Sequence, residues 1–238
     1  MCTVTFVPTK NGFIFTSNRD EDPQRAASKL IEEKRGEHTI TFPQDQGAKG
    51  TWFAFSNRQQ FVCVLNGAFE PHIRKSSYSM SRGAMALAFF DHLSLDQFIR
   101  DFDFSGIEPF TLLVYNAGDF REIKWDERDV HHKKLSTNAV QLWSSPTLYT
   151  DQWQVERALA FKAFVADQQP TQNAIVSFHK TQLVFVAEAL QARLGSKIPL
   201  TNIPLKTTSV SSIEGQRKGF NFIFHRTDGH IKVNKSTF

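Results

Sequence analysis

The chain has 238 residues, of which 40% are hydrophobic and 22% charged, a composition typical of a globular protein with a sizeable core and not of a disordered chain or a coiled coil. The formal net charge is +4, but the basic residues are scattered in short groups, which argues against a nucleic-acid partner. No stretch approaches the roughly 18 apolar residues of a membrane helix, and residues 1–20 lack the apolar run of a signal peptide, so we expect no membrane span and a cytoplasmic protein.

The first predicted element is a β-hairpin. Two runs rich in β-branched and aromatic residues flank the Asn-Gly pair at 11–12, which is the strongest short hairpin-turn signal. If this pair forms the centre of a type I′ turn, facing residue numbers sum to 23 and Cys2 lies opposite Glu21. Arg19 then becomes a diagonal neighbour of Cys2, at about 7–8 Å between backbones, a distance that a guanidinium can span. This register gives the thiol a cationic neighbour.

The polar stretch at 23–50 is expected to form a long surface excursion with little regular structure, of the kind that often edges a functional site. Hydrophobic periodicity and turn signals predict the remaining elements. In chain order these are a hairpin at 51–65, helices at 76–93 and 94–99, a three-stranded meander at 110–135, helices at 151–167 and 175–193, and strands at 207–213, 220–225 and 230–233. Because strands and helices come in blocks, we expect an α+β fold with antiparallel sheets. The length suits one large domain or two small ones.

Phenylalanine is unusually abundant, with 23 residues. Phe-rich strands usually fill a core, and the alternative is a pocket for an acyl chain or a flat apolar ligand. Cys63 lies in an apolar run and is expected to be a small core residue, so no structural disulfide is predicted. His131 and His132 are adjacent on a predicted strand and would point to opposite faces, so we predict no metal site, and we predict no cofactor.

Seven short motifs follow one another along the chain. They are Met-Cys at 1–2, Asn-Arg-Asp-Glu at 18–21, Gly-Thr-Trp at 50–52, Asn66, Ser-Arg-Gly at 81–83, Pro-Phe-Thr-Leu-Leu at 109–113 and Leu-Ser-Thr-Asn at 135–138. In this order they resemble the NRDE family, also called the transport and Golgi organisation protein 2 family. The resemblance implies the αββα four-layer sandwich of N-terminal nucleophile (Ntn) hydrolases, with two antiparallel sheets flanked by helices, in a single domain over residues 1–238. It also implies distant similarity to choloylglycine hydrolases and penicillin V acylases.

The resemblance also implies catalytic residues. In choloylglycine hydrolases a terminal cysteine is assisted by an arginine and an aspartate three residues apart at the end of the second strand. Cys2 matches the nucleophile, and Arg19 with Asp22 matches that spacing. The hairpin register points Glu21 toward Cys2 instead, and Asp20 is the third candidate. The choice among the three carboxylates stays open from the sequence.

Further site residues follow from the same resemblance. Asn66 and Asn138 look like the two asparagines that such hydrolases use for oxyanion and substrate contacts. We add Glu21, Trp52 and Arg82 as candidate substrate-binding residues. Trp52 is also typical of a core position, and Arg82 of a helix start.

One position departs from the family pattern. Thr208 stands where most members carry a late arginine, and Lys206 or Arg217 is a candidate replacement.

The implied mechanism needs the removal of Met1. This leaves an α-amine with a pKa of about 7.7–8.0, which can take the proton of the Cys2 thiol, itself near 8.5 when unperturbed. The predicted activity is hydrolysis of a small or non-peptide amide through a thioester. The alternative is a non-catalytic carrier on the same scaffold for an apolar ligand such as an acyl conjugate, a lipid or haem. The sequence leaves the oligomeric state open.

Overall fold

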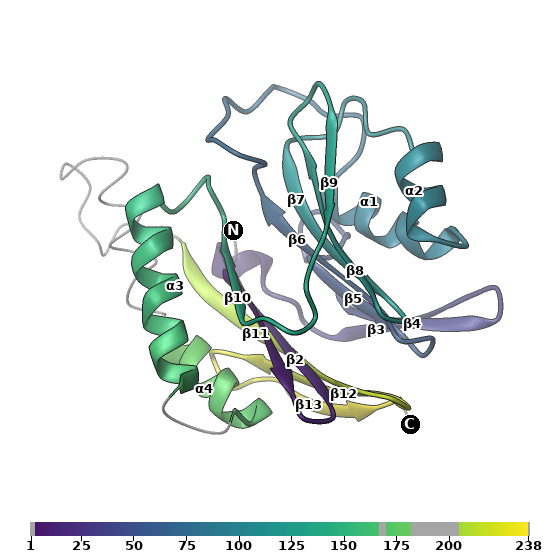
Figure 1. The fold of residues 1–238 in the computed structure, drawn as a ribbon. Coiled ribbons are helices and arrows are strands. Elements are labelled where there is room, and N and C mark those ends of the chain that lie inside the picture. The colour runs from purple at the N-terminus through teal and green to yellow at the C-terminus, as the bar shows by residue number, and fades with distance from the viewer. Residues whose placement is uncertain (1–2, 167–169, 182–204, 238) are drawn as a thin grey trace. The chain divides into compact units, whose positions relative to one another are not determined.

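The computed structural model in Figure 1 describes residues 3–166, 170–181 and 205–237. The chain forms two compact units. Unit 1 comprises Met1–Ala26 and Asn138–Phe238, and unit 2 comprises Ala27–Thr137, so that unit 2 is inserted between the first hairpin and the rest of unit 1. Each unit contains one antiparallel sheet and its own helices. The predicted α+β class with two antiparallel sheets is therefore confirmed.

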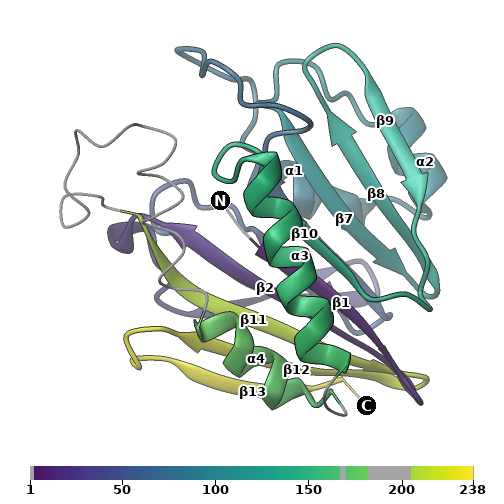
Figure 2. The same cartoon turned by 60° about the vertical axis from the view of Figure 1, so that its left-hand side comes forward.

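In the described residues of unit 1, the sheet has six strands in the order β10-β1-β2-β11-β12-β13. Its elements are β1 (Thr3–Thr9), β2 (Gly12–Glu21), the 3-10 helix η1 (Pro23–Arg25), β10 (Gln141–Ser144), α3 (Asp151–Ala166), α4 (Gln172–Thr181), β11 (Lys206–Gln216), β12 (Gly219–Arg226) and β13 (Lys232–Ser236). Both α3 and α4 lie on one face of this sheet (Figure 2). Val7 and Ile14 from the sheet meet Phe161 and Ile175 from these helices in a shared core.

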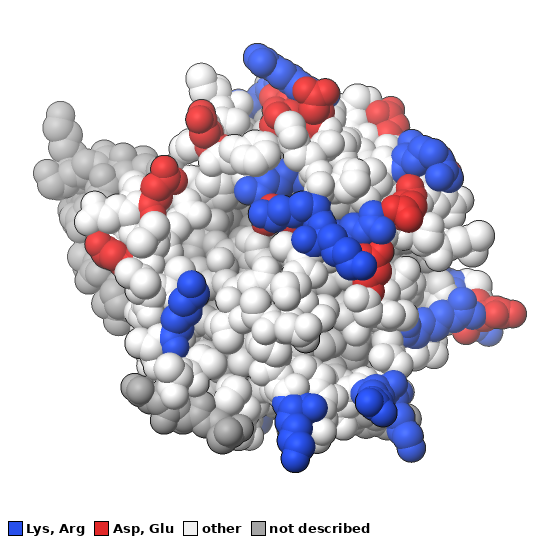
Figure 3. Space-filling model, viewed as in Figure 1, with Lys and Arg blue, Asp and Glu red and all other residues white. Residues whose placement is uncertain are grey.

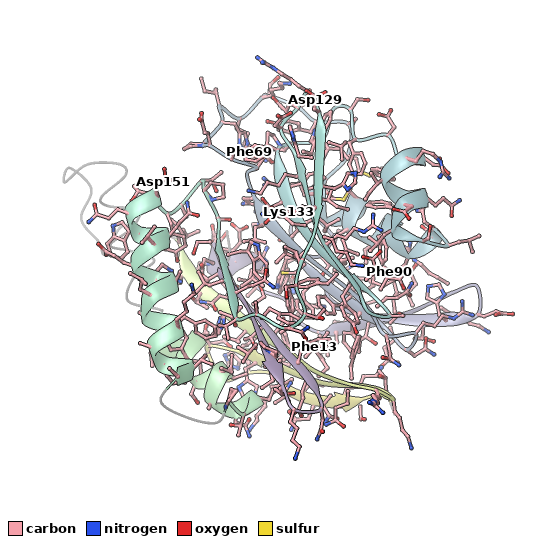
Figure 4. The ribbon with its side chains drawn as sticks, viewed as in Figure 1. Phe13, Phe69, Phe90, Asp129, Lys133 and Asp151 are labelled. Carbon is pink, nitrogen blue, oxygen red and sulfur yellow. The ribbon has the colours of Figure 1, made fainter. Side chains whose placement is uncertain are left out.

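The sheet of unit 2 is a meander of seven strands, each paired with the next along the chain. Its elements are β3 (Leu30–Arg35), β4 (His38–Pro43), β5 (Phe53–Ser56), β6 (Gln60–Asn66), α1 (Arg82–Ala88), η2 (Phe89–Asp91), α2 (Leu95–Asp101), β7 (Phe110–Asn116), β8 (Asp119–Trp125) and β9 (Val130–Lys134). The helices cover one face of the sheet and share its core, in which Phe90 (Figure 4) lies with its ring 5.2 Å from that of Phe89. Most of the 23 phenylalanines are buried, and Cys63 is fully buried, both as predicted.

The first hairpin forms, but the predicted register is wrong. Val4 pairs with Ser17 and Thr9 with Gly12, so that facing residue numbers sum to 21 instead of 23. Gly12 is needed inside the sheet and not in the turn, because a Cβ at this position would lie 1.9 Å from the backbone oxygen of Gly215 in β11. The predicted pairing of Glu21 with position 2 is lost with this shift. The shift is by two residues, so it leaves each β2 side chain on the face that was predicted.

The predicted excursion at 23–50 is also wrong, because β3 and β4 form a hairpin there with Gly36 in its turn at φ 57°. The charges of β3 belong to an edge strand, where charged side chains are common. The helix predicted at 76–93 begins only at Arg82, behind the N-cap Ser81. Strand β10 was not predicted.

The helices predicted at 94–99 and 151–167 and the meander are confirmed, whereas the last part of the helix predicted at 175–193 lies outside the described residues. Among the described residues, no helix is long and apolar enough to cross a membrane.

Candidate functional site

Four strand ends meet at one end of the sheet of unit 1. At the start of β1, Thr3 pairs with Ser144 at the end of β10. At the start of β11, Thr207 pairs with Asp20 at the end of β2. This end of the sheet therefore holds the Asn-Arg-Asp-Glu motif together with the residue that follows Cys2 in the chain. Cys2 itself lies outside the described residues.

Arg19 lies on the face of β2 that also carries Glu21. Its side chain is only 5% exposed, and Nη2 is 3.5 Å from Oε2 of Glu21. Nη1 donates to the backbone oxygen of Arg25 at 3.3 Å, and the Arg25 guanidinium contacts the same Glu21 oxygen at 3.0 Å. The predicted shared face of Arg19 and Glu21 is thus confirmed. These contacts hold a buried guanidinium in one orientation at the end of the strand.

Asp20 points to the opposite face of the same strand, because side chains alternate along β2. It is fully buried, and the Thr207 hydroxyl donates to its Oδ1 at 2.6 Å. Burial raises the pKa of Asp20, while the Thr207 hydrogen bond and the positive charge of Arg157 act in the opposite direction. Asp20 is the carboxylate of the motif that is most completely enclosed.

The other candidate carboxylate has a local partner. Asp22 is the N-cap of η1, and its Oδ1 accepts a hydrogen bond from the backbone N–H of Gln24 at 2.9 Å. Such a contact stabilises the first turn of the helix and gives Asp22 a structural role. The role of Asp22 in catalysis stays a prediction.

The late arginine of the family has no equivalent in β11. The pairing of β11 with β2 shifts between Thr207 and Ser209, so Thr208 is the extra residue of a β-bulge, and its hydroxyl donates to the backbone oxygen of Arg19 at 3.1 Å. Arg217 follows β11 at the other end of the strand, so this candidate replacement is wrong. Lys206 pairs with Glu21 at the correct end and has an exposed side chain.

A buried arginine that was not predicted lies at the same end of the unit 1 sheet, on the face that α3 and α4 cover, which we call the helix face. Arg157 of α3 is 5% exposed, its Nη2 donates to the Thr3 hydroxyl at 2.5 Å, and its guanidinium carbon lies 4.2 Å from the centre of the Tyr149 ring. No sequence motif marks Arg157, because arginines on amphipathic helices are usually exposed. Only the packing of α3 on the sheet reveals it.

A buried histidine lies next to this arginine. His179 of α4 is fully buried, Nδ1 contacts the side-chain oxygen of Asn18, and Nε2 is 2.8 Å from the Thr5 hydroxyl. Burial, together with the charge of Arg157, lowers the pKa of His179 to about 3. The imidazole is therefore neutral at physiological pH. It links α4 to the first two strands.

The motifs in unit 2 also meet at one place. A Cβ on Gly83 would lie 2.5 Å from the backbone oxygen of Thr51, so the Gly-Thr-Trp and Ser-Arg-Gly motifs touch through their backbones. Arg82 donates to the backbone oxygen of Pro109 at 3.1 Å and forms an ion pair with Glu108 at 3.0 Å. The same Pro109 oxygen accepts a hydrogen bond from the backbone N–H of Gly67 at 3.0 Å. Arg82 therefore fixes the segment that follows Asn66.

Elsewhere in unit 2 the charges are paired in small groups. Lys133 of β9 (Figure 4) forms an ion pair with the buried Glu122 of β8 at 3.1 Å. The Lys124 amine lies 4.5 Å from the centre of the half-exposed Phe69 ring. Figure 3 shows one group of lysines and arginines beside acidic residues near the centre of the view, while other basic side chains on this face stand alone. Among the described residues, no cluster of His, Cys, Asp and Glu has the arrangement of a metal site.

The family model for Transport and Golgi organisation 2 matches residues 1–197. The chain belongs to this family. A cysteine-to-alanine mutant and an arginine-to-leucine variant of conjugated bile acid hydrolase from Clostridium perfringens are similar solved structures. Each has a TM-score of 0.52 and 10% identity and covers 99% of this chain and 92% of the other.

The Caenorhabditis elegans orthologue of N-acylethanolamine-hydrolyzing acid amidase covers 89% of this chain and 92% of its own, with a TM-score of 0.44 and 10% identity. A comparison with curated proteins gave no match. This member of the Transport and Golgi organisation 2 family therefore has the Ntn-hydrolase fold.

The structure locates the other residues predicted from the Transport and Golgi organisation 2 motifs. Asn138 is exposed and begins the second part of unit 1. Asn66 ends β6 in unit 2 and is half-buried. Trp52 is 6% exposed and precedes β5, as expected for a core position. The roles of these residues in binding or catalysis stay predictions.

Proposed function

We propose that this chain is a cysteine amidohydrolase that acts on small or non-peptide amides after removal of Met1. The observation that carries the proposal is the pair of buried charges on adjacent residues of β2, Arg19 and Asp20, one on each face of the strand. They lie at the sheet end where β1 begins, and the first described residue of β1 directly follows Cys2. The shared fold with conjugated bile acid hydrolase supports the same reaction class.

The two charges suit two different tasks. The side chain of Thr3 points to the helix face, so a strand that continues by one residue would direct the Cys2 thiol to the face of Arg19. A guanidinium near a thiol favours the thiolate, which is the reactive form. Asp20, on the helix face, would hold the α-ammonium group that forms when the terminal amine accepts the thiol proton.

The proposed chemistry balances within the substrate, Cys2 and water. The Cys2 sulfur forms a bond to the amide carbon, the C–N bond breaks, and the proton taken by the α-amine leaves with the amine product. Water then cleaves the thioester, releasing the acid and restoring the thiol. Asn66 and Asn138 remain the proposed donors to the oxyanion, where one donor is worth roughly 3–4 kcal/mol.

The carrier hypothesis is the main competitor. Abundant phenylalanine was the feature in its favour, but most of these side chains fill the cores of the described units. Core packing therefore explains the abundance of phenylalanine without an apolar ligand. The carrier role becomes the preferred function only if Cys2 proves unreactive.

The decisive experiment combines intact mass spectrometry with alkylation by iodoacetamide across a pH series. We expect a protein without Met1, in which Cys2 is alkylated with an apparent pKa below 8.5 while buried Cys63 stays unmodified. Arg19→Gln should raise that pKa. Arg25→Gln is the matched control, because Arg25 binds the same carboxylate from a side chain that is 41% exposed.

Activity is then tested against a panel of N-acyl amides of small amines and amino acids, with Cys2→Ala as the inactive reference. Retention of Met1 together with an inert Cys2 would overturn the proposal. Alkylation of Cys2 that is unaffected by Arg19→Gln would remove the assigned role of Arg19.

A further inference from the structure

We propose that Arg157 is a positioning residue for the terminal nucleophile, acting through Thr3 and Asp20 and not on the substrate. This inference rests on the proposed function, because it assigns to α3 the task of holding the start of β1 in place. Thr3 is one residue from Cys2, and consecutive Cα atoms are about 3.8 Å apart. A contact that fixes Thr3 therefore limits the motion of Cys2.

The position of Arg157 in its helix is unusual. α3, which begins at Asp151 (Figure 4), has two buried residues, Arg157 and Phe161, spaced by four and therefore on the same side of the helix. Phe161 fills the core between the helix and the sheet. A leucine or methionine at 157 would extend that apolar stripe. Burying a guanidinium there costs free energy, so a compensating role is expected.

The contacts of Arg157 point to the sheet end and not to solvent. Its Nη2 donates to Thr3, and its guanidinium carbon lies over the Tyr149 ring, 4.2 Å from the ring centre. No described residue accepts a hydrogen bond from Nε or Nη1, so the hydrogen bond to Thr3 and the contact with the Tyr149 ring set the orientation of the group. At the start of β1, Thr3 is thus held by backbone pairing with Ser144 on one side and by Arg157 from above.

Arg157 also acts on the two titratable groups that it faces. Its positive charge favours the carboxylate form of Asp20, against the effect of burial, and the nearby Tyr149 hydroxyl acts in the same direction. The same charge opposes protonation of His179, which keeps that imidazole neutral. Among the described residues, the buried charged groups on the helix face of this sheet end are therefore the Arg157 guanidinium and the Asp20 carboxyl group. Arg157 supplies a cation in a chain that carries Thr208 in place of the late arginine.

The test compares Arg157→Met with Lys162→Met, which removes a positive charge from an exposed position of the same helix. Amide hydrogen exchange of residues 3–5 is the first readout, because it reports the fixing of β1 whether or not the protein is an enzyme. We expect exchange at least tenfold faster in Arg157→Met and unchanged in Lys162→Met. The second readout is the pH profile of Cys2 alkylation, which should be displaced only in Arg157→Met.

Two further variants keep the test decisive. Thr3→Val removes only the hydroxyl that accepts from Arg157 and should reproduce the faster exchange even if Arg157→Met does not fold. Arg157→Lys should restore part of the effect on the Cys2 profile, because it restores the charge. In an active enzyme, kcat should fall in Arg157→Met while KM stays unchanged.

The outcomes separate the two proposals. Equal exchange of residues 3–5 in wild type, Thr3→Val and any folded Arg157→Met protein would overturn the positioning role. An inert Cys2 in the wild type combined with faster exchange in the variants would overturn the proposed hydrolase while leaving Arg157 as the anchor of β1.

Discussion

Removing the hydrogen bond from Thr207 to Asp20 would show whether the buried Asp20 side chain is ionised. The distance between Thr207 Oγ1 and Asp20 Oδ1 is 2.6 Å, within the range of an O–H···O⁻ bond, and both residues are buried. Bonds to charged groups contribute about 1.5–3 kcal/mol, against about 0.5–1.5 kcal/mol for neutral pairs. We therefore expect Thr207→Val to lower the free energy of unfolding by about 1.5–3 kcal/mol at pH 7, or the Tm by about 3–12 °C.

A double-mutant cycle separates charge from packing. In an Asp20→Asn background the same Thr207→Val change should cost only about 0.5–1.5 kcal/mol, measured by urea denaturation. At a pH low enough to protonate Asp20, Thr207→Val should cost the same in both backgrounds, because protonation turns Asp20 into a neutral acceptor. Since burial raises the pKa of Asp20, the native state loses stability as the pH rises through that pKa, and Asp20→Asn should remove this loss. Equal costs in both backgrounds at pH 7 would refute an ionised Asp20, and with it the assigned role as partner of the α-ammonium.

Three further predictions concern the surrounding structure. Arg82→Met should cost about 1–3 kcal/mol in urea denaturation, because Arg82 pairs with a mostly buried Glu108 at 3.0 Å, whereas Arg74→Met, 3.9 Å from the same carboxylate and 79% exposed, should cost less than about 0.5 kcal/mol; similar costs would contradict this. Gly83→Ala should cost about 1–3 kcal/mol in thermal denaturation, because its Cβ would lie 2.5 Å from a backbone oxygen, and an unchanged Tm would contradict this contact. Burial lowers the pKa of His179 from 6.5 to about 3, so on acidification the unfolded chain binds a proton before the folded chain does. The free energy of unfolding, measured by urea denaturation, should therefore fall by up to about 1.4 kcal/mol for each pH unit as the pH is lowered from 6.5 to 3. His179→Gln should flatten that dependence.

Local sequence patterns predicted most elements of the fold because each pattern carries its own period. Strand β12 alternates, with Phe220, Phe222 and Phe224 buried, and α4 repeats near 3.6 residues, with Ile175, Val176 and His179 buried. The register of the first hairpin could not be predicted, because Gly12 serves a close approach to β11, a strand 200 residues later in the chain. The edge strand β3 was missed because its charges resemble those of a loop.

The candidate site was predictable only in part, for a related reason. The alternation of side chains predicted that Arg19 and Glu21 share one face of β2, and in the structure they do so and form an ion pair at 3.5 Å. The buried surroundings of Asp20 come from Thr207 and Arg157, which lie more than 130 residues away in sequence. A motif identifies the residues at the end of a strand, but the partners that affect their protonation are brought to them by tertiary packing.

The alternation of side chains along β2 also limits which substitutions can preserve the site. Arg19 and Asp20 are neighbours in sequence, but they point to opposite faces and cannot neutralise each other. Each has its own compensation: Glu21 and a backbone oxygen for Arg19, and the Thr207 hydroxyl with the charge of Arg157 for Asp20. Exchanging the two residues would place each charge among the partners of the other, a carboxylate beside Glu21 and a guanidinium near Arg157. The order Arg-Asp in the motif is therefore fixed by the two faces of the sheet, and in the proposed mechanism this order separates the group that would favour a thiolate from the group that would hold an ammonium.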